Sequence, residues 1–343
     1  MTRRGLDGFL VSGIKNIRYL CGFTGDSAYL LIGRERDWFL TDSRYVTQAR
    51  AEVKGAGIRV YKKPLEAIAE LADEHGLRLI GFESDNLTVD ACGRFRKALG
   101  RVRLKPFSGL LDALRSKKDP FEVERIRRSV RILTRCYGVV ERMLRPGARE
   151  CDIALAVEAA AKADGAEAMA FDTIMASGPR GALPHGKASD KRIRNGELVV
   201  VDMGVVFDGY NSDCTRTYCI GRATARVREV YQTVLDAQMR AIEMVRPGVA
   251  AAEIDRVARE HIDGAGYGAY FGHGTGHGVG LEIHERPGIG PFGKEVLAEG
   301  MVITVEPGIY IPGWGGVRIE DMLLVTADGF EILTKAPKGL VCI

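Results

Sequence analysis

The first third of the chain alternates short apolar runs with stretches that have helical spacing. Apolar runs occupy residues 8–11, 28–32, 38–40 and 79–82. Residues 65–74 repeat their apolar positions at the period of an α-helix. Short strands that alternate with helices are typical of an α/β fold. The pattern therefore predicts one α/β domain over residues 1–115.

A helix start marks the boundary with the rest of the chain. The polar stretch 115–119 ends at Asp119, which can cap a helix. Pro120 suits the first helical turn, and Glu122 completes a capping box with Asp119. Residues 116–343 are therefore predicted to form a second domain.

The second domain contains an internal repeat. Arg145-Pro146-Gly147 recurs 101 residues later as Arg246-Pro247-Gly248, and the same offset relates Ile153 to Ile254 and Gly165 to Gly266. Each copy has the pattern of a helix, a turn, a second helix, a glycine-rich stretch and two strands. This period is longer than the roughly 20 to 50 residues of solenoid repeats. We predict a duplicated α+β half with pseudo-twofold symmetry and a site between the halves.

The first half places two aspartates on neighbouring strands. Residues 197–206 read as a buried strand with Asp202 in its middle, and Asp208-Gly209 is a strong signal for a two-residue hairpin turn. Counting outward from that turn pairs Asp202 with Thr215. Asp213 then lies on the same face, roughly 7 to 8 Å away on the diagonal. Two carboxylates on one buried face require either a shared proton or a cation between them.

The second half supplies a matching pair and a histidine. The strand-like runs 301–311 and 316–326 carry Glu306 and Glu320. The glycine-rich stretch 272–278 can bring a histidine into a crowded centre, because glycines allow close backbone approach. Four carboxylates and one imidazole suit two divalent ions about 3.5 to 4 Å apart, with manganese, iron, cobalt or zinc as candidates. We therefore predict a hydrolase-type metal centre.

Composition and charge narrow the class of protein. Hydrophobic residues make up 46% and charged residues 27% of the 343 residues, which excludes wholesale disorder. The net charge of +4 is too small for the positive field of a nucleic-acid binder, so no nucleic-acid partner is expected. Without a signal peptide or an apolar run of about 18 residues, we expect no membrane partner. Seven scattered cysteines without a Cys-x-x-Cys pair favour a reducing, cytoplasmic location.

Several motifs together resemble those of the pita-bread metallopeptidases, the family of aminopeptidase P, prolidase, methionine aminopeptidase and creatinase. The motifs are VVVDMG (199–204), YNSDCTRT (210–217), GHGTGHGVG (272–280), TVEPGIY (304–310), GVRIED (316–321) and, for the N-terminal domain, LTDSRY (40–45). The resemblance implies an α/β two-domain protein. A creatinase-like N-terminal domain would precede a pseudo-twofold α+β pita-bread catalytic domain.

The resemblance also implies a ligand set for two metal ions. Asp202 chelates one metal, Asp213 and Glu320 bridge both, and His277 and Glu306 hold the other. A hydroxide that bridges the two metals would attack the scissile carbonyl.

Roles for the remaining polar residues follow from the same resemblance. His185 and His284 are similar to the pair that contacts the substrate and the tetrahedral intermediate, and Glu306 would carry the proton to the leaving amine. His273 and Arg318 resemble substrate-binding positions of the proline-directed branch.

These features favour a di-metal Xaa-Pro peptidase of the aminopeptidase P or prolidase type, acting on proline-containing peptides. We expect manganese, with cobalt or zinc as alternatives, and the resemblance suggests a homodimer. Whether the substrate is a dipeptide or a longer peptide stays open, and the aminopeptidase type, which acts on longer peptides, is slightly favoured.

Three other functions fit the sequence less well. A methionine aminopeptidase-like enzyme is less favoured, because those enzymes generally lack the N-terminal domain. A non-catalytic binding module is less favoured because all five metal positions are intact. Residues 181–187 (GALPHGK) imitate a phosphate-binding loop, but Ala188 replaces the required Ser or Thr.

Overall fold

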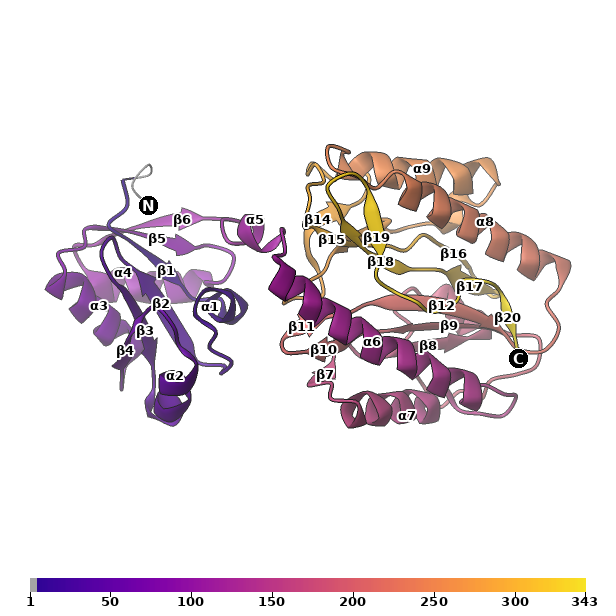
Figure 1. Ribbon diagram of the computed structural model, residues 1–343, viewed down its shortest axis with the longest axis horizontal. Coiled ribbons are helices and arrows are strands. Elements are labelled where there is room, and N and C mark those ends of the chain that lie inside the picture. Colours follow the sequence, from indigo (N-terminus) through magenta and orange to yellow (C-terminus); the bar gives the residue numbers. More distant parts are fainter. Residues whose placement is uncertain (1–4) are drawn as a thin grey trace. The chain divides into compact units, whose positions relative to one another are not determined.

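The computed structural model describes residues 5–343, and the chain divides into two compact units, residues 1–115 (unit 1) and residues 116–343 (unit 2). Figure 1 follows the chain from one unit into the other. Each unit has its own hydrophobic core. The two are therefore described separately.

Unit 1 is a six-stranded mixed sheet in the order β4-β3-β2-β1-β5-β6. Its strands are β1 (Gly8–Val11), β2 (Ala28–Ile32), β3 (Asp37–Thr41), β4 (Gly57–Val60), β5 (Leu79–Glu83) and β6 (Arg103–Phe107). Its helices are α1 (Ile14–Cys21), η2 (Ser43–Tyr45), α2 (Val46–Glu52), α3 (Pro64–Glu74), α4 (Val89–Leu99) and α5 (Asp112–Arg115). The predicted apolar runs and the helix at 65–74 are confirmed to within a residue or two at each end.

Helices cover both faces of the unit 1 sheet. In β1, Leu10 belongs to one buried cluster, whereas Phe9 and Val11 belong to another. Ile68 of α3 packs in the cluster of Leu10, and Ile17 of α1 packs in the cluster of Phe9. Successive strand residues point to opposite faces, so this division shows that the sheet is buried on both sides.

Unit 2 repeats a pair of helices. The helices are α6 (Pro120–Met143), α7 (Glu150–Ala163), α8 (Ala225–Glu243) and α9 (Ala251–Gly264), with η3 (Gly178–Ala182) and η4 (Gly268–Tyr270) as short turns. Figure 1 shows the α6–α7 pair and the α8–α9 pair on opposite sides of the strands. The turn glycines Gly147 and Gly248 share left-handed φ angles of 90° and 88°. The predicted repeat and the capping box at Asp119 are both confirmed.

The strands of unit 2 form four small sheets. In chain order they are β7 (Ala168–Met169), β8 (Ile174–Ser177), β9 (Leu198–Met203), β10 (Val205–Phe207), β11 (Tyr210–Asn211), β12 (Cys214–Cys219), β13 (Gly276–Gly278), β14 (Glu285–Ile289), β15 (Val302–Val305), β16 (Gly308–Ile311), β17 (Gly315–Arg318), β18 (Asp321–Val325), β19 (Phe330–Ile332) and β20 (Val341–Cys342). The sheet orders are β11-β10-β7, β20-β12-β9-β8, β14-β13-β15-β18-β19 and β16-β17.

The hairpin of the first half has the predicted register. Asp208 and Gly209 form its turn with φ angles of 46° and 78°, and Asp202 pairs with Thr215. The expectation of one strand over 197–206 was wrong, because β9 ends at Met203 and β10 begins at Val205. At Gly204 a Cβ atom would lie 2.1 Å from the carbonyl oxygen of Ser212, so only glycine fits where these two segments approach.

The hairpin of the second half is interrupted in the same way. Val305 pairs with Asp321 and Gly308 pairs with Arg318, so the intervening register sets Glu306 opposite Glu320. The predicted runs 301–311 and 316–326 are thus each divided in two. Pro307 lies at one break, and proline cannot donate to a strand ladder.

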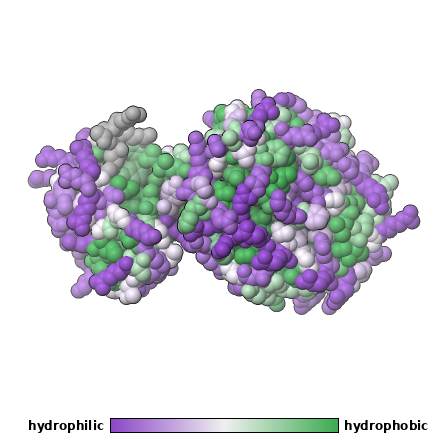
Figure 2. Space-filling view, in the orientation of Figure 1, coloured by the Kyte–Doolittle hydropathy of each residue, from purple (hydrophilic) through white to green (hydrophobic). Residues whose placement is uncertain are grey.

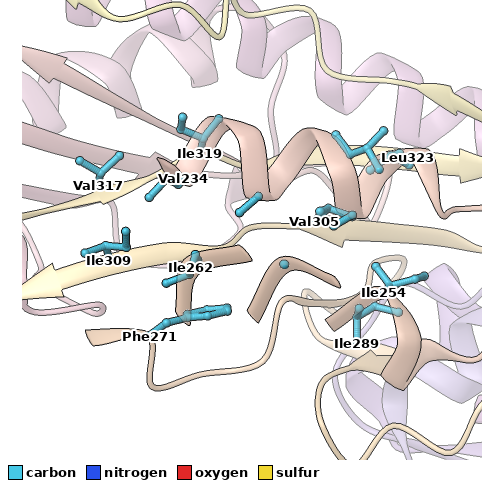
Figure 3. Packing of buried hydrophobic residues seen from close by; sticks show 14 of the residues in the cluster. Val234, Ile254, Ile262, Phe271, Ile289, Val305, Ile309, Val317, Ile319 and Leu323 are labelled. Atoms are coloured by element: carbon cyan, nitrogen blue, oxygen red, sulfur yellow. The ribbon is translucent and has the colours of Figure 1, made fainter. Parts of the chain in front are cut away.

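Apolar side chains from the helices and strands fill the core of the second half. Figure 3 shows part of this cluster, to which Val234 of α8 and Ile254 and Ile262 of α9 contribute together with Val305 and Leu323 of the sheet. All five are at most 1% exposed, and burial of such a side chain contributes roughly 1.5 to 3 kcal/mol. A second cluster fills the first half. These two cores hold the hairpins that carry the acidic residues.

The helix α6 carries several arginines, and two of them, Arg127 and Arg135, have acidic partners. Arg127 pairs with Glu331, and Arg135 pairs with Asp164. Figure 2 shows hydrophilic residues gathered over the surface where α6 lies. Among the helices of residues 5–343, none has the length and apolar content needed to span a bilayer.

Candidate metal centre

A cavity of about 600 Å³ in unit 2 brings together all nine residues singled out from the sequence. They are Asp202, Asp213, His277, Glu306, Glu320, His185, His284, His273 and Arg318. The first half contributes three of them and the second half six. The cavity therefore lies where the repeat predicts a site.

The four carboxylates come from the broken ends of the two hairpins. Asp202 lies near the end of β9, and Asp213 directly precedes β12. Glu306 directly follows β15, and Glu320 directly precedes β18. Asp202, Asp213 and Glu320 are 8%, 4% and 1% exposed, so the strand breaks concentrate acidic groups in a nearly dry space.

His277 faces these carboxylates from β13. Its Nδ1 lies 3.0 Å from the carbonyl oxygen of Gly278, which makes Nδ1 the N–H donor and leaves Nε2 with a free lone pair. Nε2 lies 3.5 Å from Oδ2 of Asp213 and 3.4 Å from Oε1 of Glu306. A backbone partner on the other ring nitrogen is the usual arrangement of a metal-ligating histidine.

Burial and mutual repulsion perturb the pKa values of this cluster. Burial, with the charges of Glu320 and Asp202, raises the pKa of Asp213 well above its usual range, and burial also raises that of Glu320. Burial raises the pKa of Glu306 to about 7 and lowers the pKa of His277 to about 4. The carboxylates therefore need positive charge between them, either as protons or as cations.

Two oxygen atoms in the cluster point to a cation. Within residues 5–343, Asp202 Oδ1 and Glu320 Oε1 are buried without a hydrogen-bond partner. Ligand atoms of Asp213, His277 and Glu320 all lie within 4.8 Å of one another. Carboxylate oxygens with one imidazole nitrogen suit a divalent metal, and unsatisfied buried oxygens are costly without one. The residues present therefore fit divalent ions.

Arg318 is the buried cation beside this cluster. Its guanidinium donates to Asp202 Oδ2 at 2.6 Å and to the hydroxyl of Tyr310 at 2.8 Å. It also donates to the carbonyl of Pro184 and the hydroxyl of Thr215, both at 3.0 Å. Four of its five N–H groups thus contact protein atoms. This geometry holds Asp202 in place, and any contact with substrate stays a prediction.

His273 lies on the cavity wall next to Tyr310. Its Nε2 is 2.8 Å from the Tyr310 hydroxyl, and its Nδ1 is 2.7 Å from the carbonyl of Gly274. Burial lowers the pKa of His273 to about 4 and therefore keeps the ring neutral near pH 7. The ring is thus oriented by its neighbours before any substrate binds.

His185 and His284 are the exposed imidazoles of the cavity. His185 follows the turn η3, and His284 directly precedes β14. The ring of His284 stands edge-on to that of His277, with centroids 4.2 Å apart. Both side chains can therefore contact a molecule bound in the cavity from the positions that they occupy.

Sequence reasoning missed two polar residues of this site. Tyr310 links His273 to Arg318, and Thr215 donates to Glu320 Oε2 at 2.7 Å. Tyr310 lies in the apolar run 308–311, where a hydroxyl reads as part of the core, and Thr215 lies two residues after Asp213. The motifs that contain them, residues 304–310 and 210–217, were the available signal.

Comparisons with known proteins agree with this geometry. Residues 124–327 match the family described as metallopeptidase family M24, and residues 1–117 match the creatinase/prolidase N-terminal domain. A protein of Pyrococcus furiosus named Xaa-Pro dipeptidase is 40% identical, and the match covers 99% of this chain and 97% of that protein.

Solved structures extend the likeness to the fold. An Xaa-Pro dipeptidase from Bacillus anthracis is 40% identical with a TM-score of 0.97, over 100% of this chain and 96% of that one. An X-Pro aminopeptidase from Thermotoga maritima is 37% identical with a TM-score of 0.92, over 99% and 98%. The chain therefore belongs to metallopeptidase family M24 and carries the creatinase/prolidase N-terminal domain of that family.

Proposed function

We propose that this chain is a metal-dependent Xaa-Pro peptidase, which cleaves the bond between an N-terminal residue and a following proline. The observation that carries the proposal is that four acidic residues and His277, from both halves, converge in one cavity. Two of their carboxylate oxygens, Asp202 Oδ1 and Glu320 Oε1, are buried there without a hydrogen-bond partner among the described residues. The names of the relatives in Pyrococcus, Bacillus and Thermotoga supply the substrate class.

The donor set would hold two divalent ions. Asp202, Asp213, His277, Glu306 and Glu320 are the proposed ligands, with Asp213 and Glu320 shared between the ions. Bound there, the ions would lower the pKa of the attacking water and polarise the scissile carbonyl. Mostly oxygen ligands with one imidazole favour manganese, with cobalt and zinc as alternatives.

Glu306 is placed to move the proton in this reaction. Its Oε1 accepts from the hydroxyl of Thr304 at 3.3 Å, which orients the carboxylate. A carboxylate beside the attacking water can take a proton from it and return that proton to the leaving nitrogen. The position of Glu306 in the cavity therefore suits a proton carrier.

His185 and His284 are proposed to stabilise the reacting carbonyl. Both side chains are exposed in the cavity and can donate an N–H to an oxygen that gains negative charge. Arg318 holds Asp202, and His273 stands beside it on the wall. Each of these roles stays a proposal that single substitutions can test.

Two further properties belong to the proposal. The seven cysteines are unpaired, which suits a reducing cytoplasm. A homodimer is proposed on the family resemblance. Sedimentation of the purified protein would decide its oligomeric state, with a mass near twice 37.4 kDa expected.

Product analysis tests the activity. Metal-free protein is loaded with Mn²⁺ and incubated with Ala-Pro, Ala-Pro-Ala and Met-Ala-Ser, and mass spectrometry identifies the products. Release of proline from Ala-Pro or of Pro-Ala from Ala-Pro-Ala supports the proposal and distinguishes a dipeptidase from an aminopeptidase. Asp213→Asn serves as the inactive control. Cleavage of Met-Ala-Ser alone would favour a methionine aminopeptidase, and no cleavage would favour a binding module.

A further inference from the structure

The loop that carries two of the site histidines consists mostly of glycine. Residues 272–278 read Gly-His-Gly-Thr-Gly-His-Gly. Glycine has more backbone freedom than any other residue, so such a loop does not hold one conformation by itself. His277 must nevertheless keep Nε2 within 3.5 Å of both Asp213 and Glu306. Contacts from outside the loop therefore have to fix it.

Asp255 of α9 supplies one set of these contacts. Its side chain is buried, and Oδ1 accepts from the backbone N–H of Thr275 at 3.0 Å and from the Thr275 hydroxyl at 2.8 Å. The carbonyl of Thr275 in turn accepts from the backbone N–H of Glu306 at 2.7 Å. One carboxylate thus fixes the middle of the loop and, through it, the backbone of Glu306.

Arg259, one turn further along α9, holds one carbonyl of the loop and the carbonyl of the residue just before it. Its Nε and Nη2 donate to the two oxygens of Asp255, each at 2.9 Å. Nη1 donates to the carbonyl of Phe271 at 3.0 Å, and Nη2 donates to the carbonyl of His273 at 2.7 Å. A planar guanidinium makes these bonds together, whereas the ammonium of lysine is a single point of donation.

A second ion pair on the same helix provides a contrast. Arg256 and Glu260 also stand four residues apart in α9, and their charged atoms are 2.9 Å apart. These side chains are 57% and 63% exposed, and exposed pairs of this kind contribute little. Both pairs lie in α9, both join residues four positions apart, and each contains an arginine. The pair Asp255–Arg259 differs because it is turned inward onto the loop.

We propose that Asp255 and Arg259 are positioning residues, which lock the glycine-rich loop so that His277 and Glu306 keep the geometry that binds a divalent cation. The inference rests on the proposed function, because it assigns the pair a purpose toward the metal site. Residues that orient metal ligands from outside the ligand set commonly change metal affinity by roughly 10- to 100-fold when replaced.

The test compares Arg259→Lys with Arg256→Lys. Both variants keep the charge of α9, but only the first loses the guanidinium that reaches the loop. Isothermal titration of metal-free protein with Mn²⁺ measures affinity, and amide hydrogen exchange measures the opening of residues 271–278. Thermal unfolding shows that each variant is folded at the temperature used. Asp255→Asn keeps an oxygen acceptor for Thr275 and serves as a second, milder variant.

We expect Arg259→Lys to weaken Mn²⁺ binding at least about tenfold and to speed exchange in 271–278, with Asp255→Asn in between and Arg256→Lys unchanged. Wild-type affinity and exchange in Arg259→Lys would overturn the inference. So would a lowered melting temperature with unchanged affinity and exchange, because the pair would then only stabilise the fold. If wild type itself binds no Mn²⁺, the proposed function fails, and loop exchange alone decides the inference.

Discussion

Replacing Glu306 with glutamine should stabilise the metal-free protein at alkaline pH, although Glu306 is a proposed metal ligand. Without a cation, the Glu306 carboxylate is buried close to Asp213, Glu320 and Asp202, and burial raises its pKa from 4.5 to about 7. Glutamine has nearly the same shape and can still accept the hydrogen bond from Thr304. The substitution therefore removes a buried negative charge and little else.

The direction and size of the effect follow from proton binding. Between pH 4.5 and pH 7 the folded protein keeps a Glu306 proton that the unfolded chain releases, so the free energy of unfolding falls as the pH rises. Above pH 7 the full shift corresponds to about 3 kcal/mol. The Glu306→Gln variant does not lose stability in this way, because glutamine has no proton to release. Its stability relative to wild type should therefore increase by up to about 3 kcal/mol between pH 5 and pH 8.5.

Tryptophan fluorescence can follow unit 2 alone. Trp314 lies in unit 2 and Trp38 in unit 1, so a Trp38→Phe background leaves one reporter. Urea unfolding in a chelator at the two pH values gives the stability of both proteins, and the titrating groups that do not interact with Glu306 cancel in the comparison. The charge of Glu306 also raises the pKa values of Asp213 and Glu320, so its removal acts on them in the same stabilising direction. Excess Mn²⁺ should reverse the order, because wild type binds the ion more tightly. A stability difference that does not change with pH in the chelator would refute the reasoning.

Three further substitutions test the cavity and the core. Tyr310→Phe removes a buried hydroxyl that lies 2.8 Å from His273 Nε2, and we expect kcat/KM to fall about tenfold. Metal analysis should show unchanged metal content, because Tyr310 contacts His273 and Arg318 and is not a proposed metal ligand. Loss of metal from the variant would contradict this. Lys187 lines the cavity at 70% exposure and pairs with Asp172, so Lys187→Met should raise KM for Ala-Pro, which has a free carboxylate beside proline, but not for Ala-Pro-amide. Equal KM values for wild type and variant on Ala-Pro would exclude Lys187 as the carboxylate contact. Ile262→Ala should cost about 2 to 5 kcal/mol of stability in calorimetry, and a smaller loss would mean that the helix α9 closes the gap.

The hairpin that carries the aspartates shows how much could be predicted locally. Asp208-Gly209 forms a two-residue turn, and a turn of that length determines the register of both strands. The pairing of Asp202 with Thr215 therefore followed from counting. The repeat was visible for a similar reason, because its turn glycines occupy backbone positions that need positive φ angles.

The strand breaks could not be predicted in the same way. At the break, Gly204 lies so close to the carbonyl oxygen of Ser212 that no side chain fits there. Such a contact depends on three-dimensional approach, and an apolar run reads as one strand whether or not it is interrupted. These breaks matter for function, because they turn the acidic residues into the cavity.

The residues that support the site were hidden by ordinary patterns. Asp255 and Arg259 have the same spacing as Arg256 and Glu260 in the same helix, so their sequence pattern is that of a solvated ion pair. Only packing reveals that Asp255 is 1% exposed. The sequence predicts that Arg318 binds substrate, and that role stays a prediction. The structure adds that its buried guanidinium donates to Asp202, Tyr310, Pro184 and Thr215.

Counting bound metal during an activity titration tests whether the cavity holds two metal ions that the peptidase activity needs. Metal-free protein is titrated with Mn²⁺, native mass spectrometry counts the ions on each chain, and the release of proline from Ala-Pro is measured at every point. We expect activity to appear with metal uptake, to reach its maximum at two ions per chain, and to be absent from an Asp213→Asn variant. Full activity in metal-free protein, or no metal uptake by the wild type, would contradict it.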